Sequence, residues 1–321
     1  LYLEYHRGVF TSIAEEKKQN RAAERAAHDA EFLSVLSGIG YPKAELDMIW
    51  KTILLNQFHD ILPGSAIDEV YSIASDEYGK AMDECSRIIG MVLSSLGGEG
   101  KEAAAVSTSS YTIDAVLVSD RSCPSFSLMQ RTYDGRYAYL LPSLPPMGWK
   151  AYECPIKRDD PVITGTLPAF ETPFYRVELT DGFISSLYDK AEGREIAEGG
   201  KSLNRLVSYE DRPLDYDNWN IEEYYDQKGY VWTFENASIV ENGPVRGVIK
   251  ASWTYSRSRI EEEIVFYAHT RRIDFNAVID WNDDHALVKA EFPTSIFADR
   301  AWYGTQFGAQ SRSIHCNTSW D

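Results

Sequence analysis

The sequence has little of what several common protein classes require. Its few cysteines show no CxxC pair, so we expect reduced thiols and a cytoplasmic location rather than a disulfide framework; they are Cys85, Cys123, Cys154 and Cys316. No apolar run approaches the roughly 20 residues that a membrane-spanning helix needs. The GxSxG, P-loop and Rossmann glycine patterns are also absent, so the chain has no motif of the classes that these patterns mark.

Positive charge is scarce as well. There are 32 Lys and Arg against 49 Asp and Glu, which gives a formal net charge of −17 at pH 7. Phosphate groups would be repelled, so neither nucleic acid nor an anionic membrane is expected as a partner, whereas a neutral ligand such as a sugar fits. The 8 Trp and 20 Tyr suit a carbohydrate site, but the cores of β-sandwiches use aromatic rings too.

The first third of the chain has the apolar spacing of helices. Apolar residues recur every three to four positions across residues 11–97, with breaks near Gly38 and at Pro63-Gly64. The pattern predicts three helices that suit a bundle. The first helix is expected to begin at a capping box formed by Thr11-Ser12 and Glu15, and the second to span residues 44–62. The third is expected to begin at a Ser65 cap, with Asp68 at the reciprocal position.

After Ala105 the apolar spacing changes to two, which predicts short strands separated by turns. We therefore expect an α+β multidomain fold: a three-helix bundle over residues 1–98, a small β-sandwich domain over 101–160 and a large β-sandwich over 165–321. The chain has no initiator Met and stops abruptly. We interpret it as a fragment whose large sandwich is truncated at the C-terminus.

The most informative segment is Leu54–Ser65, with the sequence LLNQFHDILPGS. Asn56, His59 and Asp60 stand at spacings of three and four, so on a continuous helix they share one flank. An imidazole is a common metal ligand, and a neighbouring carboxylate can itself ligate a metal, orient another ligand or position a hydroxyl. Zinc needs about three or four protein donors, so one histidine cannot hold it. His59 is therefore either one contributor to a site completed elsewhere or a structural histidine.

The string NQFHDILPGS resembles the signature of glycoside hydrolase family 38, the metal-dependent α-mannosidases. The flanking Trp50-Lys51 and Val70-Tyr71 agree with it, and Leu1–Ser12 resembles the entry into the family's helical domain in its cytosolic and bacterial subgroup. The resemblance implies a retaining α-mannosidase that acts on α-mannoside oligosaccharides. It also implies that the large sandwich is a galactose-mutarotase-like super-sandwich.

The resemblance assigns roles to the histidine–aspartate pair. His59 would be one ligand of a catalytic Zn²⁺, and Asp60 would hydrogen-bond sugar hydroxyls beside the metal. In the family the carboxylate nucleophile and the remaining ligands lie in an N-terminal barrel-like domain. We therefore expect no catalytic residue in this chain, an incomplete metal site, and no glycosidase activity from the chain alone.

Three further residues are candidate sugar contacts by the same resemblance. His6 falls where the family places a side chain that lines the sugar pocket. Asp217 and Trp219 lie in a stretch, 210–221, that resembles a β-domain segment near the active site. Simpler roles are available for each: His6 as an exposed capping residue, and Trp219 as a ring packed under an Asp/Asn turn.

A different class of function also fits the sequence: a non-catalytic carbohydrate-binding or scaffold module, which would need no metal. A possible homo-oligomer is compatible with either class. Asp280–His285 has enough donors to suggest a second metal site, but it follows a predicted strand and is better interpreted as a polar turn. His269 and His315 have no partner at ligand spacing.

Overall fold

The computed structural model describes residues 6–38, 40–97, 103–123, 128–152, 160–305 and 308–315. The chain forms two compact units. The helical unit comprises Leu1–Lys101 together with Arg212–Glu222, and the β unit comprises Glu102–Asp211 together with Glu223–Asp321. The segment Arg212–Glu222 therefore packs with the helical unit, although both of its neighbours in sequence belong to the β unit.

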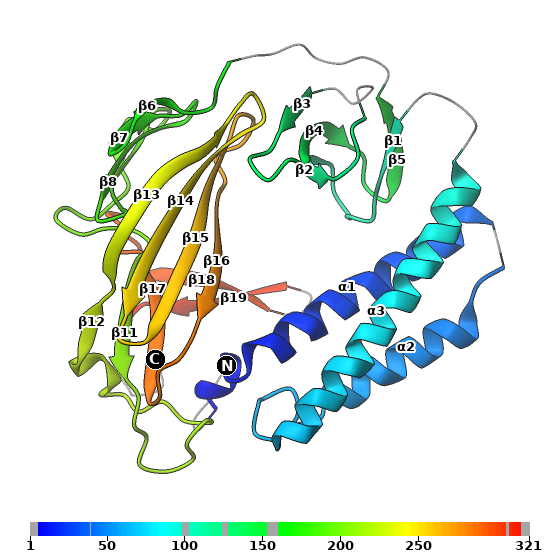
Figure 1. The fold of residues 1–321 in the computed structure, drawn as a ribbon, viewed down its shortest axis with the longest axis horizontal. Coiled ribbons are helices and arrows are strands. Elements are labelled where there is room, and N and C mark those ends of the chain that lie inside the picture. The colour runs from blue at the N-terminus through cyan, green and yellow to red at the C-terminus, as the bar shows by residue number, and fades with distance from the viewer. Residues whose placement is uncertain are drawn as a thin grey trace. The chain divides into compact units, whose positions relative to one another are not determined.

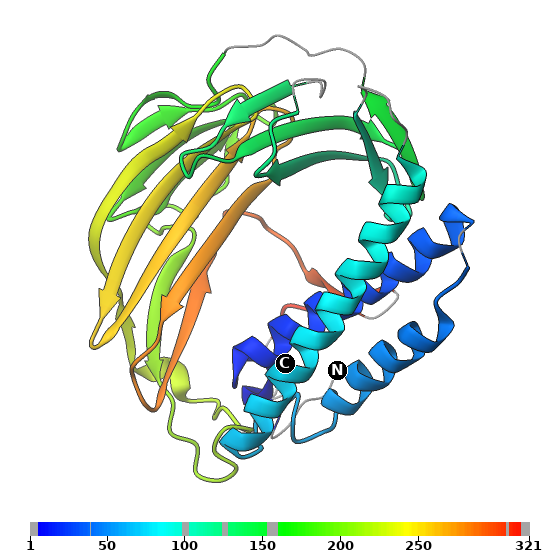
Figure 2. The same cartoon turned by 45° about the vertical axis from the view of Figure 1, so that its right-hand side comes forward.

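The helical unit contains a short 3-10 helix and three α-helices: η1 (Gly8–Phe10), α1 (Ala14–Ser37), α2 (Lys43–Asn56) and α3 (Asp68–Leu96). The α-helices lie side by side in both ribbon views (Figure 1 and Figure 2). Small residues of α1 face larger ones in a core made of Ala23, Ala27, Ala30, Leu46, Ile49, Ile53, Tyr78, Ala81, Cys85 and Ile88. The alanine spacing gives α1 a flat face that its neighbours approach closely. None of the described helices has the length and apolar character needed to cross a bilayer.

The helix caps predicted from the sequence are wrong. Ile13, in the left-handed region with φ 47°, is the N-cap residue of α1, and its side chain makes no capping hydrogen bond. The Ser12 hydroxyl donates instead to the Gly8 carbonyl at 3.0 Å. Ile67, the N-cap residue of α3, makes no such bond either, and the Ser65 hydroxyl donates to Asp60 Oδ1 at 3.2 Å. Both hydroxyls therefore stabilise turns before the helices rather than the helix ends.

The predicted second helix, residues 44–62, is too long. α2 ends at Asn56, whose side-chain amide donates to the Thr52 carbonyl at 3.1 Å. The N–H of Phe58 bonds to the carbonyl of Leu55 and the N–H of Ile61 to that of Phe58, at 3.1 and 2.9 Å, so the chain tightens into three-residue turns. The helix therefore ends well before the proline stop, and residues 57–64 form a series of turns.

The β unit is built of antiparallel strand pairs throughout its described residues. Its first part holds the sheets β1-β5 and β2-β4-β3, made of β1 (Ala103–Ser107), β2 (Ile113–Ser119), β3 (Leu128–Arg131), β4 (Tyr137–Leu144) and β5 (Gly148–Tyr152). Three helices followed by antiparallel sheets confirm the predicted α+β class. The expected borders of the two β-domains remain predictions.

The second part contains the larger sheets. The sheet β10-β9-β8-β7-β6 is made of β6 (Thr164–Thr166), β7 (Ala169–Glu171), β8 (Tyr175–Thr180), β9 (Phe183–Asp189) and β10 (Arg194–Glu195). The sheet β13-β14-β15-β16, whose long strands are visible in Figure 2, is made of β13 (Thr233–Asn242), β14 (Arg246–Tyr255), β15 (Ser258–Tyr267) and β16 (Ile273–Asp280). The remaining strands are β11 (Arg205–Glu210), β12 (Gly229–Val231) and β17 (Ala286–Glu291) in the order β12-β11-β17, and the hairpin of β18 (Arg300–Thr305) and β19 (Gly308–Ser313).

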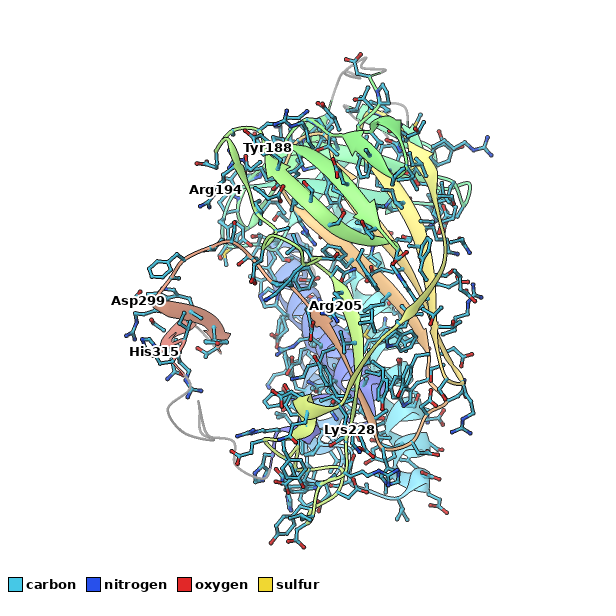
Figure 3. The ribbon with its side chains drawn as sticks, turned by 90° about the vertical axis from the view of Figure 1, so that its left-hand side faces the viewer. Tyr188, Arg194, Arg205, Lys228, Asp299 and His315 are labelled. Atoms are coloured by element: carbon cyan, nitrogen blue, oxygen red, sulfur yellow. The ribbon has the colours of Figure 1, made fainter. Side chains whose placement is uncertain are left out.

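Alternating apolar residues join the two largest sheets. Phe170 of β7 meets Phe266 of β15 edge to face, with ring centroids 5.4 Å apart, in a cluster that also holds Val177 and Ile249. These side chains alternate with outward-facing polar ones along their strands, as a sandwich requires. Figure 3 shows Asp299 and His315 at the hairpin β18–β19 of this unit.

Candidate functional site

The polar residues of the motif divide into two groups, and the first group is structural. Asn56 is 2% exposed, and its amide also donates to Glu77 Oε2 of α3 at 2.8 Å. Gln57 Nε2 donates to Asn20 Oδ1 and Glu24 Oε1 of α1, at 3.0 and 2.8 Å. These bonds tie the end of α2 to both other helices. Asn56 therefore does not share an exposed flank with His59, contrary to the prediction.

The second group, His59 and Asp60, lies on the turns after α2 and faces solvent. Their side chains are 72% and 48% exposed, and His59 Nε2 stands 3.5 Å from Asp60 Oδ2. The ring of Phe58 contacts the imidazole with centroids 4.2 Å apart. The predicted exposure near the end of α2 is confirmed, but the predicted helical setting is wrong. Turns place both side chains on the surface without any need for a helical flank.

The backbone around Asp60 is held firmly. Its carbonyl accepts the N–H of Ser65 at 3.2 Å and the Tyr71 hydroxyl at 3.5 Å. The Ser65 hydroxyl donates to Asp60 Oδ1 at 3.2 Å, so one carboxylate oxygen is fixed while Oδ2 faces His59. A carboxylate beside an imidazole can fix the orientation of the ring.

The end of the motif is held by two side chains from outside it. Lys17 Nζ of α1 donates to the Pro63 carbonyl at 3.0 Å. Asn218 Nδ2, from Arg212–Glu222, donates to the Gly64 carbonyl at 2.6 Å. Gly64 has φ 96°, and a Cβ there would lie 2.7 Å from the Ser12 carbonyl oxygen, so only glycine fits.

The segment Arg212–Glu222 brings two more predicted residues to the helical unit. The N–H of Gly8 donates to the Trp219 carbonyl at 2.8 Å, and the rings of His6 and Trp219 contact each other with centroids 5.0 Å apart. Asp217 is exposed, and its Oδ1 accepts the N–H of Asn218 at 3.0 Å. The structure thus brings His6 into contact with Trp219, and all five predicted site residues belong to the helical unit.

Two titratable residues near the motif were missed from the sequence. Glu16 of α1 is 2% exposed, its Oε2 has no hydrogen-bond partner among the described residues, and burial raises the pKa of its carboxyl. Burial lowers the pKa of the neighbouring Lys17 to about 8. Both occupy ordinary helix positions, so no sequence signal distinguishes them. The role of Lys17 becomes visible only in the structure, where it contacts the Pro63 carbonyl, 46 residues away in sequence.

A metal would need more donors than this site offers. No group of three or more His, Cys, Asp or Glu able to hold a metal occurs within the described ranges. His59 contributes an exposed imidazole and Asp60 an exposed carboxylate. Their chemistry fits one side of a zinc shell, whose other donors must come from other residues.

In the donor-rich stretch Asp280–His285, Asp280 is the last residue of β16, and residues 281–285 form the polar bend that leads to β17. Asp283 accepts the Ser258 hydroxyl at 2.7 Å, which together with further hydrogen bonds lowers the pKa of its carboxyl. Asp280 accepts the Asn282 amide at 3.0 Å. His269 has a buried Nδ1 without a hydrogen-bond partner in the described part of the chain, and burial lowers its pKa. His315 lies at the end of the hairpin β18–β19 in the β unit (Figure 3).

The chain is thus a multidomain α+β protein, in which a three-helix unit carrying an exposed histidine–aspartate turn precedes antiparallel sheets. This arrangement can be compared with those of known families. The α-mannosidase middle-domain model matches residues 4–96, and the C-terminal domain model of glycosyl hydrolases family 38 matches residues 170–321. The chain belongs to glycosyl hydrolase family 38, of which it carries the middle and C-terminal regions.

Individual relatives agree with this assignment. The chain is 30% identical over 351 residues to alpha-mannosidase 2C1 of Homo sapiens and 28% identical over 342 residues to an alpha-mannosidase of Saccharomyces cerevisiae. All of this chain is covered, but it spans only 32% and 29% of those proteins, about a third of their length. A crystal structure of an alpha-mannosidase from Enterococcus faecalis superposes on 98% of this chain and 46% of its own, with a TM-score of 0.77 and 15% identity, so it shares the fold.

Proposed function

We propose that this chain is the helical and C-terminal part of a retaining, metal-dependent α-mannosidase that removes terminal α-linked mannose from oligosaccharides. One observation carries the proposal: His59 and Asp60 stand exposed and adjacent on a turn whose backbone is held by Ser65, Tyr71, Lys17 and Asn218. The relatives named α-mannosidases are about three times longer than this chain. The nucleophile and the remaining metal ligands are therefore proposed to lie in the rest of the protein.

His59 and Asp60 would have different roles at the bound sugar. His59, in its neutral form, supplies one nitrogen donor to Zn²⁺. When bound, the metal supplies Lewis-acid contact to the sugar's vicinal hydroxyls. Asp60 keeps the imidazole oriented and accepts a hydrogen bond from a sugar hydroxyl with the oxygen that Ser65 does not hold.

The other three candidate residues would shape the pocket. Trp219 offers an apolar ring to the sugar's C–H face, with His6 packed against that ring. Asp217 offers an exposed carboxylate for a hydroxyl. We also propose a cytoplasmic location, because Cys85 and Cys123 are both free thiols.

The test is metal analysis beside kinetics on the complete enzyme. His59→Ala should weaken metal binding at least about 100-fold and abolish hydrolysis of an aryl α-mannoside, because a metal ligand is lost. The free energy of unfolding should change by no more than about 0.5 kcal/mol, as for an ordinary exposed site.

His28→Ala is the matched control, because His28 is also an exposed histidine beside an aspartate, with Nδ1 3.3 Å from Asp29 Oδ1. It should leave metal content and turnover unchanged. Full metal content and a near-normal rate in His59→Ala would make His59 structural. That result would favour a carbohydrate-binding module.

A further inference from the structure

Asn218 links two parts of the candidate site that lie far apart in sequence. Its side chain bonds to the end of the motif, and its neighbours Asp217 and Trp219 are the candidate sugar contacts. We propose that Asn218 is a positioning residue, which fixes the loop bearing Asp217 and Trp219 against the turn bearing His59 and Asp60. The inference rests on the proposed function and adds a positioning residue to it.

Asn218 is bonded through both its side chain and its backbone. Its Nδ2 donates to the Gly64 carbonyl at 2.6 Å, and its own carbonyl lies 3.0 Å from the Ser12 hydroxyl, whose single proton it shares with the Gly8 carbonyl. The next residue accepts the N–H of Gly8 at its carbonyl, at 2.8 Å. Three hydrogen bonds from two stretches of the helical unit therefore converge on two consecutive loop residues.

The conformation of Asn218 explains why asparagine stands there. Its φ is 74°, in the left-handed region that glycine and asparagine tolerate best. Glycine would adopt this backbone but has no amide to donate, and aspartate would place a carboxylate against the Gly64 carbonyl. Asparagine is the side chain that combines the left-handed backbone with a short N–H donor.

Two glycines keep the space that this contact needs. A Cβ on Gly8 would lie 2.8 Å from the Asn218 carbonyl oxygen, and a Cβ on Gly64 would lie 2.7 Å from the Ser12 carbonyl oxygen. Both distances are too short for a real side chain, so each approach depends on glycine. Gly8 thus leaves room for the loop that Asn218 anchors, and Gly64 lets the motif turn approach Ser12, whose hydroxyl contacts Asn218.

The experiment compares Asn218→Gly and Asn218→Asp with wild type in the complete enzyme. Asn218→Gly should raise KM for an aryl α-mannoside about tenfold, the size expected for one lost hydrogen bond, with kcat changed less than about threefold and metal content unchanged. Asn218→Asp should raise KM further, because its carboxylate faces a carbonyl oxygen. Asn282→Gly, which removes an amide from the turn after β16, is the matched control and should leave KM unchanged.

Two further readouts separate positioning from general stability. Hydrogen–deuterium exchange in peptides spanning residues 58–66 and 214–221 should accelerate in Asn218→Gly and not in Asn282→Gly. Asn218→Gly combined with Trp219→Ala should cost no more than Trp219→Ala alone, because Asn218 acts through that loop.

The outcomes are distinguishable from failure of the proposed function. Unchanged KM and unchanged exchange in Asn218→Gly would overturn the positioning role while leaving the metal test of His59 intact. Additive losses in the double variant would overturn it too, because Asn218 would then act independently of Trp219. Loss of metal in Asn218→Gly would show an effect on the metal site rather than on the loop, and would also overturn it.

Discussion

Two turns of this molecule carry the same kinds of side chain and use them differently. The motif turn, residues 57–65, and the strand turn, residues 281–285, each contain histidine and aspartate. In the strand turn, Asp283 accepts the Ser258 hydroxyl, and Asp284 lies 3.4 Å from the guanidinium of Arg257. In the motif turn, outside groups bind the backbone carbonyls of Asp60, Pro63 and Gly64, and the side chains of His59 and Asp60 stay exposed.

The difference lies in which groups the fold occupies. Asp283 uses its carboxylate to hold its own turn, and its side chain is only 10% exposed, although Asp284 beside it is 86% exposed. A turn whose backbone is held by other elements can present its side chains outward without losing order. The number of donors in a sequence is therefore a poorer guide to a site than the bonds those donors already make.

The largest expected effect is the absence of activity when the motif turn is separated from the rest of the enzyme. Residues 1–321 alone should show no hydrolysis of an aryl α-mannoside, because two donors cannot hold a metal and the nucleophile is expected elsewhere. The complete enzyme, assayed in parallel, should turn over. Activity in the shorter chain would mean that the catalytic residues have been placed wrongly.

A smaller effect should separate the two members of the exposed pair. Asp60→Asn in the complete enzyme should keep its metal but lower kcat about 100-fold, because a charged hydrogen bond to the transition state is weakened. Asp284→Asn is the control from the strand turn and should change neither quantity. Parallel loss of metal and rate in Asp60→Asn would make Asp60 a metal ligand instead.

The smallest effect should appear in the strand turn, where stability rather than activity depends on the carboxylate. Asp283→Asn should lower the melting temperature by a few degrees at pH 7 and leave turnover unchanged. The Ser258 hydrogen bond lowers the pKa of Asp283, so its stabilisation is present above the ordinary carboxyl value and is lost as pH falls through the lowered one. The stability difference between wild type and variant should therefore shrink below about pH 4. A difference that is constant with pH would show that ionisation of Asp283 is irrelevant.

Local periodicity predicted most of the fold, because the helices and strands bury regularly spaced faces. It failed where a side chain competes with the backbone: the amide of Asn56 ends α2, and the Ser12 hydroxyl stabilises a turn instead of capping a helix. His59 and Asp60 were found through their motif. Asn218 and Lys17 were not, because their partners, Gly64 and Pro63, are 154 and 46 residues away in sequence.

The return of residues 212–222 to the helical unit has a consequence for how the protein is made. The contact between Ser12 and the Asn218 carbonyl joins residues 206 positions apart, so α1, α2 and α3 are synthesised long before the loop that packs with them. A nascent chain that folds in order from its N-terminus therefore displays His59 and Asp60 without Asp217 and Trp219 until the loop after β11 has been synthesised. A shortened gene product ending at residue 98 would display His59 and Asp60 without Asp217 and Trp219 permanently.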